Sequence, residues 1–159
     1  MHPSAQRVVD AAEARQLMID VREFPDGTRT AEDAAQAVGV EVGQIVKSLV
    51  FSVNGETVLA LVSGANRLDE GALARATGLR EADVGRLDAA AVRAATGFAI
   101  GGVPPFGHPT PLSTFVDRDL LRYDTVWAAA GTPRHVFSTT ATELVRITGA
   151  TVADLRGDT

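Results

Sequence analysis

The sequence predicts one folded domain in which helices and strands are mixed, and three observations support this. The chain has 159 residues, 45% hydrophobic and 22% charged, as is typical of a globular protein with a buried core. Apolar residues recur at helical spacing in several segments and cluster in short strand-like runs in others. The pair Asn54-Gly55 separates two such runs, which indicates a tight hairpin. We therefore expect residues 1–159 to form a single domain with a loose N-terminus.

The segments before residue 63 are expected to form three helices, a short strand and a hairpin. Thr30, with Asp33 three residues later, is a helix start signal of the capping-box type, and Gly39 is a stop signal. Asn54-Gly55 supplies the two positive φ angles that a type I′ turn needs. In chain order we expect a helix over 4–19, a strand over 21–24, the turn Pro25-Asp26-Gly27, a helix between Thr30 and Gly39, a short helix over 42–48, and hairpin strands over 49–53 and 57–62.

Helical patterns dominate the middle of the chain, and short strands follow them. Asp88 and Gly97 are the start and stop signals of one helix. A last helix begins at Thr139 or Thr140 and ends at Gly149. The other expected elements are helices over 68–76 and 81–84, a short apolar run over 98–100, a strand over 114–117, a turn or short helix over 119–123, and strands over 125–130 and 136–137.

The composition excludes several classes of function. There is no cysteine, so the chain has no disulfide framework, thiolate nucleophile or thiolate metal site. Three histidines (His2, His108 and His135) do not suffice for a His-rich zinc site, and we expect no metal and no cofactor. The motifs GxGxxG, P-loop, HExxH and GxSxG are missing, which argues against most nucleotide-binding, metalloprotease and serine-hydrolase functions.

Charge and apolar runs limit the partners and the location. The net charge of −5 argues against a broad nucleic-acid footprint, but it allows a small positive pocket that takes one end of a nucleic acid. No apolar run approaches the length needed to span a bilayer, so we expect no membrane contact. Residues 1–6 lack the charged and apolar regions of a secretory signal. We expect a cytoplasmic protein, and the sequence leaves its oligomeric state open.

Lys47 is the only lysine among fifteen basic residues, the others being arginine. It lies where a short helical pattern runs into an apolar strand pattern. Lysine offers a compact, strongly hydrated charge with three rotatable donors, which suits one phosphate oxygen or one carbonyl better than a bidentate clamp. A solvated lysine at a helix end, favoured by the helix dipole, is the alternative, and the spacing alone leaves both open.

Gly101 to Pro109 form a loop of unusual glycine and proline density. Its two adjacent glycines allow main-chain amides to approach a ligand closely, and its three prolines stiffen the loop. A rigid loop with exposed amide donors can form an oxyanion hole without charged side chains. A tight crossover between strands is the alternative interpretation.

Four other polar residues are weaker candidates. His108 could act as a general base or donor, or be a loop histidine with a satisfied ring nitrogen. Asp117 ends a strand and could face a cleft or cap a turn. Ser48 next to Lys47 could form a nucleophilic dyad, although adjacent helical residues point about 100° apart. His135 is expected to be structural or on the surface, whereas Trp127 and Phe115 are expected in the core.

The order of these motifs resembles the YbaK-type aminoacyl-tRNA editing family, which includes the inserted editing domain of bacterial prolyl-tRNA synthetase and its free-standing relatives. The matching segments are TAEDAAQAVGV (30–40), IVKSLVF (45–51), GGVPPFGH (101–108), TFVD (114–117) and AGTPR (130–134). The resemblance extends from about Phe24 to Leu155. It implies a compact α+β fold with a mixed, barrel-like sheet surrounded by helices, and hydrolysis of the ester that joins a wrong amino acid to the 3′ end of a tRNA.

The resemblance also implies roles for individual residues. Lys47 matches the lysine that holds the phosphate of the terminal nucleotide. Residues 101–105 match the GxxxP loop whose amides position the ester carbonyl, so Gly101, Gly102, Val103 and Pro105 are the other expected catalytic residues. The expected substrate-binding residues are Phe24, Thr30, Ser48, Pro104, Phe106, His108, Asp117 and Gly131.

The chain departs from the family pattern at two places. Ser48 replaces the asparagine of some alanine-specific relatives, and Ala129-Ala130-Gly131 replaces the serine-glycine-glycine stretch usual in relatives that act on cysteine. These departures affect the identity of the amino acid more than the reaction. An aminoacyl ester is already activated, so positioning and oxyanion donors can suffice, with the ribose 2′-hydroxyl of the substrate ordering the water.

Three functions follow as hypotheses. The first is a trans-editing deacylase whose partner is mischarged tRNA, with an aminoacyl-tRNA synthetase as a further partner. The second is a non-catalytic module of the same fold that binds a tRNA end or a synthetase, which the acidic net charge favours. The third is a small-molecule hydrolase that uses Ser48 and Lys47.

Overall fold

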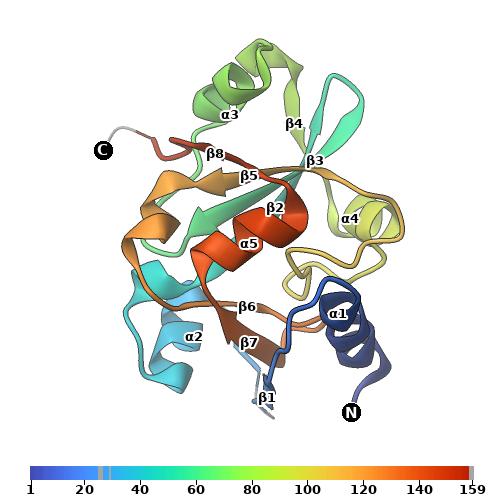
Figure 1. The fold of residues 1–159 in the computed structure, drawn as a ribbon. Helices are drawn as coiled ribbons and strands as arrows, with labels where there is room; N and C mark the ends of the chain where they lie inside the picture. The colour runs from blue at the N-terminus through green and yellow to red at the C-terminus, as the bar shows by residue number, and fades with distance from the viewer. Residues whose placement is uncertain (25–26, 29, 158–159) are drawn as a thin grey trace.

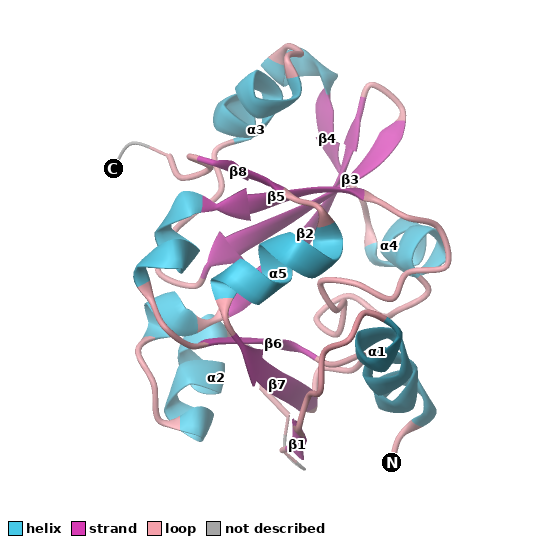
Figure 2. Ribbon diagram, viewed as in Figure 1, coloured by secondary structure: helices cyan, strands magenta, loops and turns pink. Residues whose placement is uncertain are grey.

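The computed structural model describes residues 1–24, 27–28 and 30–157, so the expected turn at Pro25 and Asp26 lies outside the described residues. Figure 1 shows helices packed around two sheets, and Figure 2 distinguishes helices from strands by colour. In the described part of the chain, no helix combines the length and apolar character that a bilayer crossing requires. The α-helices are α1 (Pro3–Ala14), α2 (Ala31–Val38), α3 (Glu70–Thr77), α4 (Ala89–Thr96) and α5 (Ala141–Thr148), and the 3₁₀ turns are η1 (Val42–Gln44), η2 (Glu81–Asp83) and η3 (Arg118–Arg122).

The strands form a larger mixed sheet and a smaller antiparallel one. The larger sheet has the order β4-β2-β3-β5-β8, in which β4, β2 and β3 pair antiparallel and β3, β5 and β8 pair parallel. The smaller sheet has the order β1-β7-β6. A parallel bridge between Ile45 and Trp127 joins the two sheets. The strands are β1 (Val21–Glu23), β2 (Val46–Val53), β3 (Glu56–Ser63), β4 (Val84–Arg86), β5 (Ser113–Asp117), β6 (Val126–Ala129), β7 (His135–Thr139) and β8 (Thr151–Ala153).

Three apolar clusters hold these elements together. The largest lies between the two sheets and includes Leu59, Phe137 and Leu144. A second packs the other face of the larger sheet against α3, and a third packs α2 against the smaller sheet around Trp127. The mixed α+β fold that the resemblance implied is therefore confirmed.

The helix caps and turn residues recognised in the sequence predicted several element ends correctly. The hydroxyl of Thr30 accepts a hydrogen bond from the Asp33 amide at 3.0 Å and caps α2. Asp88 caps α4 in the same way, and Thr140, the second of the two candidates, caps α5. The φ angles of Asn54 and Gly55 are +51° and +86°, as a type I′ turn requires.

Two expectations about elements were wrong, and a third was confirmed only in part. The helix expected over 42–48 is only the turn η1, after which Lys47 lies inside β2, because eight-residue pairing with β3 outweighs a weak helical pattern. The first helix ends at Ala14, and Gln16 follows with a φ of +62°. Residues 81–84, expected to be helical, form η2 and the start of β4, and β8 was not predicted at all.

A buried carboxylate ties the ends of β3 and β5 to the loop after β3. Asp117 is 1% exposed and accepts hydrogen bonds from the amide of Ser63 at 3.1 Å, the side chain of Asn66 at 2.8 Å and the amide of Asp119 at 3.0 Å. Because the carboxylate satisfies two main-chain donors, its removal leaves buried donors unpaired.

We expect Asp117→Ala to lower the free energy of unfolding by about 2–4 kcal/mol, since several charge-assisted hydrogen bonds are lost together. Urea denaturation measures this. Asp154→Ala is the control, because Asp154 forms an exposed ion pair with Arg118 at 3.1 Å and should change stability by less than about 1 kcal/mol. Equal effects of the two variants would contradict the structural role of Asp117.

Candidate functional site

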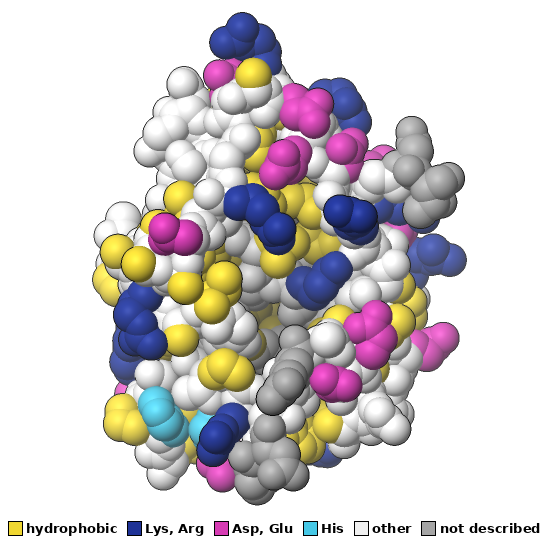
Figure 3. Space-filling view, turned by 180° about the vertical axis from the view of Figure 1, so that it is seen from behind, with side chains coloured by type: hydrophobic (Ala, Val, Ile, Leu, Met, Phe, Trp, Pro, Cys, Tyr) yellow, Lys and Arg dark blue, Asp and Glu magenta, His cyan; other side chains and the backbone are white. Residues whose placement is uncertain are grey.

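A cavity of about 380 Å³ lies where the two sheets meet, between α2, β2, β6 and the glycine-proline loop. This volume is at the small end of the range for ligand pockets in proteins. Its wall is mainly apolar near α2 and polar near Lys47. On the face of the molecule turned away in Figure 1, Figure 3 shows Lys and Arg side chains around a depression with apolar side chains. The lining includes Thr30, Ala34, Val38, Ile45, Lys47, Ser48, Ile100, Gly101, Val103, Trp127, Thr132 and Val136.

Lys47 reaches the cavity from β2 and is held by the loop after β3. Its ammonium donates a hydrogen bond to the main-chain carbonyl of Asn66. The side chain of Asn66 in turn donates to Asp117 at 2.8 Å and to Asp119 at 2.7 Å. Burial lowers the pKa of Lys47 from its usual range, an effect that the nearby carboxylates of Glu32 and Asp117 oppose. Since the described residues use one N–H, two further donors of this cation are open to a ligand as far as those residues are concerned.

The glycine-proline loop forms the opposite wall. Gly101 has a φ of +85°, and a Cβ on Gly102 would lie 2.6 Å from the Cα of Thr132, so this loop packs directly on the main chain that follows β6. The amide of Gly102 donates to the carbonyl of Ala99 at 2.9 Å. The amides of Gly101 and Val103 make no hydrogen bond to another described residue, and both residues line the cavity. They are the available amide donors here.

The structure brings together five of the thirteen residues expected from the sequence. Thr30, Lys47, Ser48, Gly101 and Val103 line the cavity. The other eight, which do not line it, are Phe24, Gly102, Pro104, Pro105, Phe106, His108, Asp117 and Gly131.

Several of these eight residues support the walls of the cavity. His108 contacts the carbonyl of Pro104 at 2.8 Å through its Nε2 atom, and burial lowers its pKa, which favours a neutral ring that braces the loop. Phe106 is 3% exposed and packs edge-to-face on Phe137. Gly131 has a φ of +96°, and a Cβ there would lie 2.5 Å from the carbonyl oxygen of Ser4.

Ser48 is one of the residues that line the cavity, but its side chain does not join that of Lys47. In a strand, successive side chains point to opposite faces, so Lys47 and Ser48 diverge. The hydroxyl oxygen of Ser48 is fully buried and has no hydrogen-bond partner among the described residues. A Ser–Lys dyad is therefore not formed, which argues against the small-molecule hydrolase.

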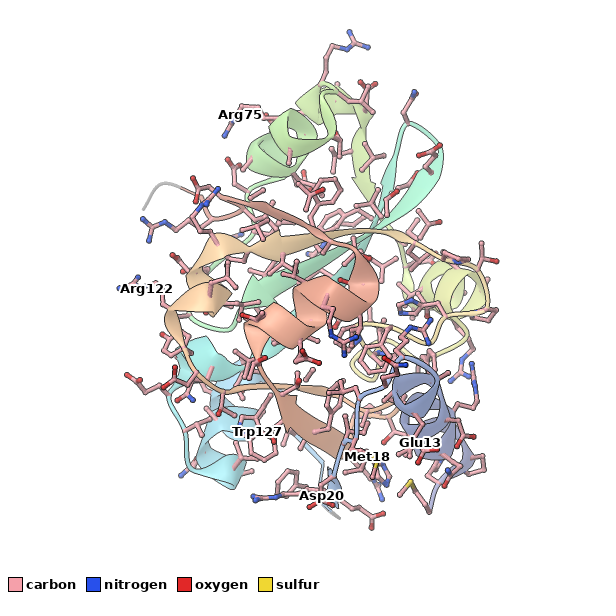
Figure 4. All side chains as sticks on the ribbon, viewed as in Figure 1. Glu13, Met18, Asp20, Arg75, Arg122 and Trp127 are labelled. Carbon is pink, nitrogen blue, oxygen red and sulfur yellow. The ribbon has the colours of Figure 1, made fainter. Side chains whose placement is uncertain are left out.

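The apolar wall next to α2 was not predicted from the sequence. Trp127, expected in the core, is only 8% exposed but also lines the cavity, and the Arg22 guanidinium lies 4.9 Å from its ring centroid. Figure 4 shows its side chain on the side of the smaller sheet nearest α2. Val38 and Ile45 complete this wall. Their positions depend on how distant segments pack, and no motif marks them, whereas Ile100 could have been suspected from its place beside the loop.

His135 has the structural position that its sequence context indicated. It is 5% exposed, and its Nε2 atom lies 2.9 Å from the Glu23 carboxylate while Nδ1 contacts the hydroxyl of Thr132. These contacts hold the segment between β6 and β7, against which the glycine-proline loop packs.

Comparison with known protein families shows which family has this fold and sequence. Residues 25–147 match the family profile of the aminoacyl-tRNA editing domain, and the chain belongs to that family. The resemblance inferred from the motifs is confirmed.

The chain is also similar in sequence to individual members of this family. The protein YwhH of Bacillus subtilis is 34% identical over 125 residues, 79% of this chain and 78% of YwhH. The proposed Cys-tRNA(Pro)/Cys-tRNA(Cys) deacylase EbsC of Enterococcus faecalis is 32% identical over 104 residues, 64% of this chain and 62% of EbsC. The chain also matches 17% of the length of the proline–tRNA ligase of a Thermoanaerobacter species, at 29% identity over 61% of this chain.

A solved structure is similar to this one over nearly the whole chain. The crystal structure of a proposed trans-editing enzyme for prolyl tRNA synthetase is 53% identical, with a TM-score of 0.93 over 99% of each chain.

We expect Ser48→Ala to keep full activity and to leave the free energy of unfolding unchanged or raised by about 1 kcal/mol. The reason is that the substitution removes a buried hydroxyl that has no partner. Deacylation rates and urea denaturation measure the two effects. A loss of activity of about 100-fold would restore the Ser–Lys dyad as a hypothesis.

We expect Gly102→Ala to lower both stability and activity, because its Cβ would overlap main-chain atoms of Thr132, which cannot move aside as a flexible side chain could. The loss in unfolding free energy should be about 1–3 kcal/mol. Gly85→Ala is the control, since a Cβ at Gly85 meets nothing within 4 Å. Thermal unfolding and deacylation assays that fail to separate the two variants would show that the loop does not depend on this contact.

Proposed function

We propose that this protein is a trans-editing hydrolase that removes the wrong amino acid from mischarged tRNA. The observation that carries the proposal is a cavity lined by Lys47 and by Gly101 and Val103, whose amides make no hydrogen bond to another described residue. Membership of the editing-domain family and the likeness to a proposed trans-editing enzyme support it.

In this proposal the two sides of the cavity have different roles. Lys47 binds the phosphate of the terminal nucleotide, because a partly desolvated ammonium with two free donors interacts strongly with an anion. The amides of Gly101 and Val103 bind the ester carbonyl oxygen and stabilise the negative charge that develops on it. Each such donor is worth about 100-fold or more in rate.

No protein nucleophile is needed in this reaction. Water attacks the ester carbon, the bond to the ribose oxygen breaks, and the proton from water is passed to that leaving oxygen. The ribose 2′-hydroxyl of the substrate orders the water. This is consistent with a cavity in which the hydroxyl of Ser48 is turned into the core.

The apolar wall next to α2 is proposed to receive the amino-acid side chain. Ala34, Val38 and Ile45 favour a small, uncharged side chain there, since burying a charge without a partner is costly. EbsC is named as a deacylase of cysteine-charged tRNA, and cysteine belongs to this size class.

A panel of tRNAs mischarged with alanine, serine, threonine or cysteine tests the proposal directly. Hydrolysis of at least one, well above the uncatalysed rate, is expected. If the protein binds uncharged tRNA or a synthetase without hydrolysing any member of the panel, the non-catalytic module is the correct function.

We expect Lys47→Met to reduce kcat/KM for the best mischarged tRNA by about 100-fold or more, since the phosphate anchor is lost. Stability should not fall. Because burial lowers the pKa of Lys47, the folded state binds its proton less tightly than the unfolded state, so the charge costs stability at neutral pH. That cost is full below the lowered pKa and disappears as pH rises from there to the pKa of the unfolded state, and Met should remove it at all pH values. Steady-state kinetics and urea denaturation at neutral pH measure both effects.

Lys47→Arg is the matched variant, because it keeps the positive charge but presents a planar fork. We expect it to recover less than about a tenth of the lost activity. A Lys47→Met protein that unfolds more easily than the wild type would mean that the lysine is mainly structural.

A further inference from the structure

A second hollow of about 310 Å³ adjoins the cavity. The two share Ser48, Leu49, Ile100 and Val103, and the hollow continues to Arg86 and Leu87 at the end of β4. We call it the β4 groove. A nucleic-acid end that fills the cavity must continue along the surface, and this hollow is contiguous with it.

The floor of the β4 groove is an open strand edge at Ser48. The two-residue turn of the hairpin makes Val53 and Glu56 a hydrogen-bonded pair, so odd-numbered residues of β2 direct N–H and C=O at β3 and even-numbered residues direct theirs away. On that outer edge β4 pairs only with residues 51–53, and Trp127 bridges only to Ile45. Within the described chain, the N–H and C=O of Ser48 therefore have no strand partner.

Arg86 gives the groove its positive charge. Its side chain is exposed, lies 6.0 Å from the Phe51 ring centroid and forms no ion pair with another described residue. Phe51 and Arg86 are opposite each other on β2 and β4, so their side chains share a sheet face. Lys47 lies on that same face, four residues or about 13 Å along β2. Lys47 on β2 and Arg86 on β4 therefore lie on the same face of the larger sheet.

We propose that the β4 groove binds the nucleotide that precedes the terminal adenosine of tRNA. Arg86 contacts its phosphate, and the free N–H and C=O of Ser48 pair with the edge of its base, which presents a donor next to an acceptor. Ile100, 56% exposed, offers an apolar surface beside the base. This inference rests on the proposed function, because it extends the same bound tRNA end by one nucleotide.

A peptide strand is the other partner that an open strand edge can accept. On this edge, residues 46–50 have no strand partner among the described residues, so length alone would admit a short peptide strand. The groove ends, however, at Arg86, which forms no ion pair with another described residue, and a phosphate satisfies that charge whereas an ordinary strand does not. The nucleotide is therefore the occupant that fits.

Two minimal substrates separate the groove from the cavity. One is the 3′-aminoacyl ester of 5′-phosphoadenosine, and the other is the same ester of 5′-phosphorylated cytidylyl-adenosine. We expect wild-type kcat/KM to be about 10-fold higher for the dinucleotide. Arg86→Ala should remove most of this gain and change the mononucleotide by less than about 2-fold. Its salt slope for the dinucleotide should fall by about 0.7, the value for one phosphate contact.

Arg75→Ala is the matched control, since it removes the same charge from α3, where Figure 4 shows the side chain directed away from the protein. It should affect neither substrate by more than about 2-fold. If Arg86→Ala slows both substrates equally, or neither, the groove assignment is wrong. If the wild type hydrolyses neither ester nor mischarged tRNA, the proposed function itself fails.

The contact with the base is tested separately. Replacing the cytosine of the dinucleotide by an abasic ribose keeps both phosphates, and we expect wild-type kcat/KM to fall by about 5-fold or more. An unchanged rate would overturn the pairing of the base with Ser48.

Discussion

The carboxylate of Asp117 organises the loop on which the position of Lys47 depends. It is buried at the end of β5 and accepts a hydrogen bond from the side-chain amide of Asn66. The main-chain carbonyl of Asn66 in turn accepts a hydrogen bond from the Lys47 ammonium. A half-buried lysine has many rotamers, and fixing one of them costs side-chain entropy. The polar chain from Asp117 through Asn66 offsets that cost before a ligand arrives. The site is thus preorganised by residues that do not touch the cavity.

The same arrangement explains how the Lys47 ammonium could bind a phosphate although the chain as a whole is acidic. With a net charge of −5, the long-range field of this protein does not attract a polyanion. A partly desolvated ammonium acts at short range, where the local dielectric is lower than in water and screening by salt is weaker. In the proposed function, such a site selects an end of a nucleic acid that can enter a cavity, and it gives little affinity for the sides of a duplex.

The elements with local signals could be predicted from the sequence, and those that depend on distant pairing could not. Thr30 and Asp88 cap helices, and Asn54 with Gly55 closes a hairpin, through bonds that span a few residues. Lys47 was misplaced on a helix because a short apolar run fits both periods until β3 is present to pair with it. The apolar wall of the cavity has no local signature, since Trp127 and Val38 meet there from segments far apart in the chain.

The position of Ser48 connects the fold to the chemistry. On a helix the side chains of Lys47 and Ser48 would have diverged by about 100°, whereas in β2 they point to opposite faces of the sheet and the Ser48 hydroxyl is buried. In the proposed reaction the ester then meets main-chain amides of Gly101 and Val103 and no serine nucleophile from β2. Peptide groups keep fixed dipoles without titrating, so they stabilise developing charge with little reorganisation. If the protein acts as proposed, its catalysis relies on the rigidity of its sheet, and the apolar wall selects the amino acid.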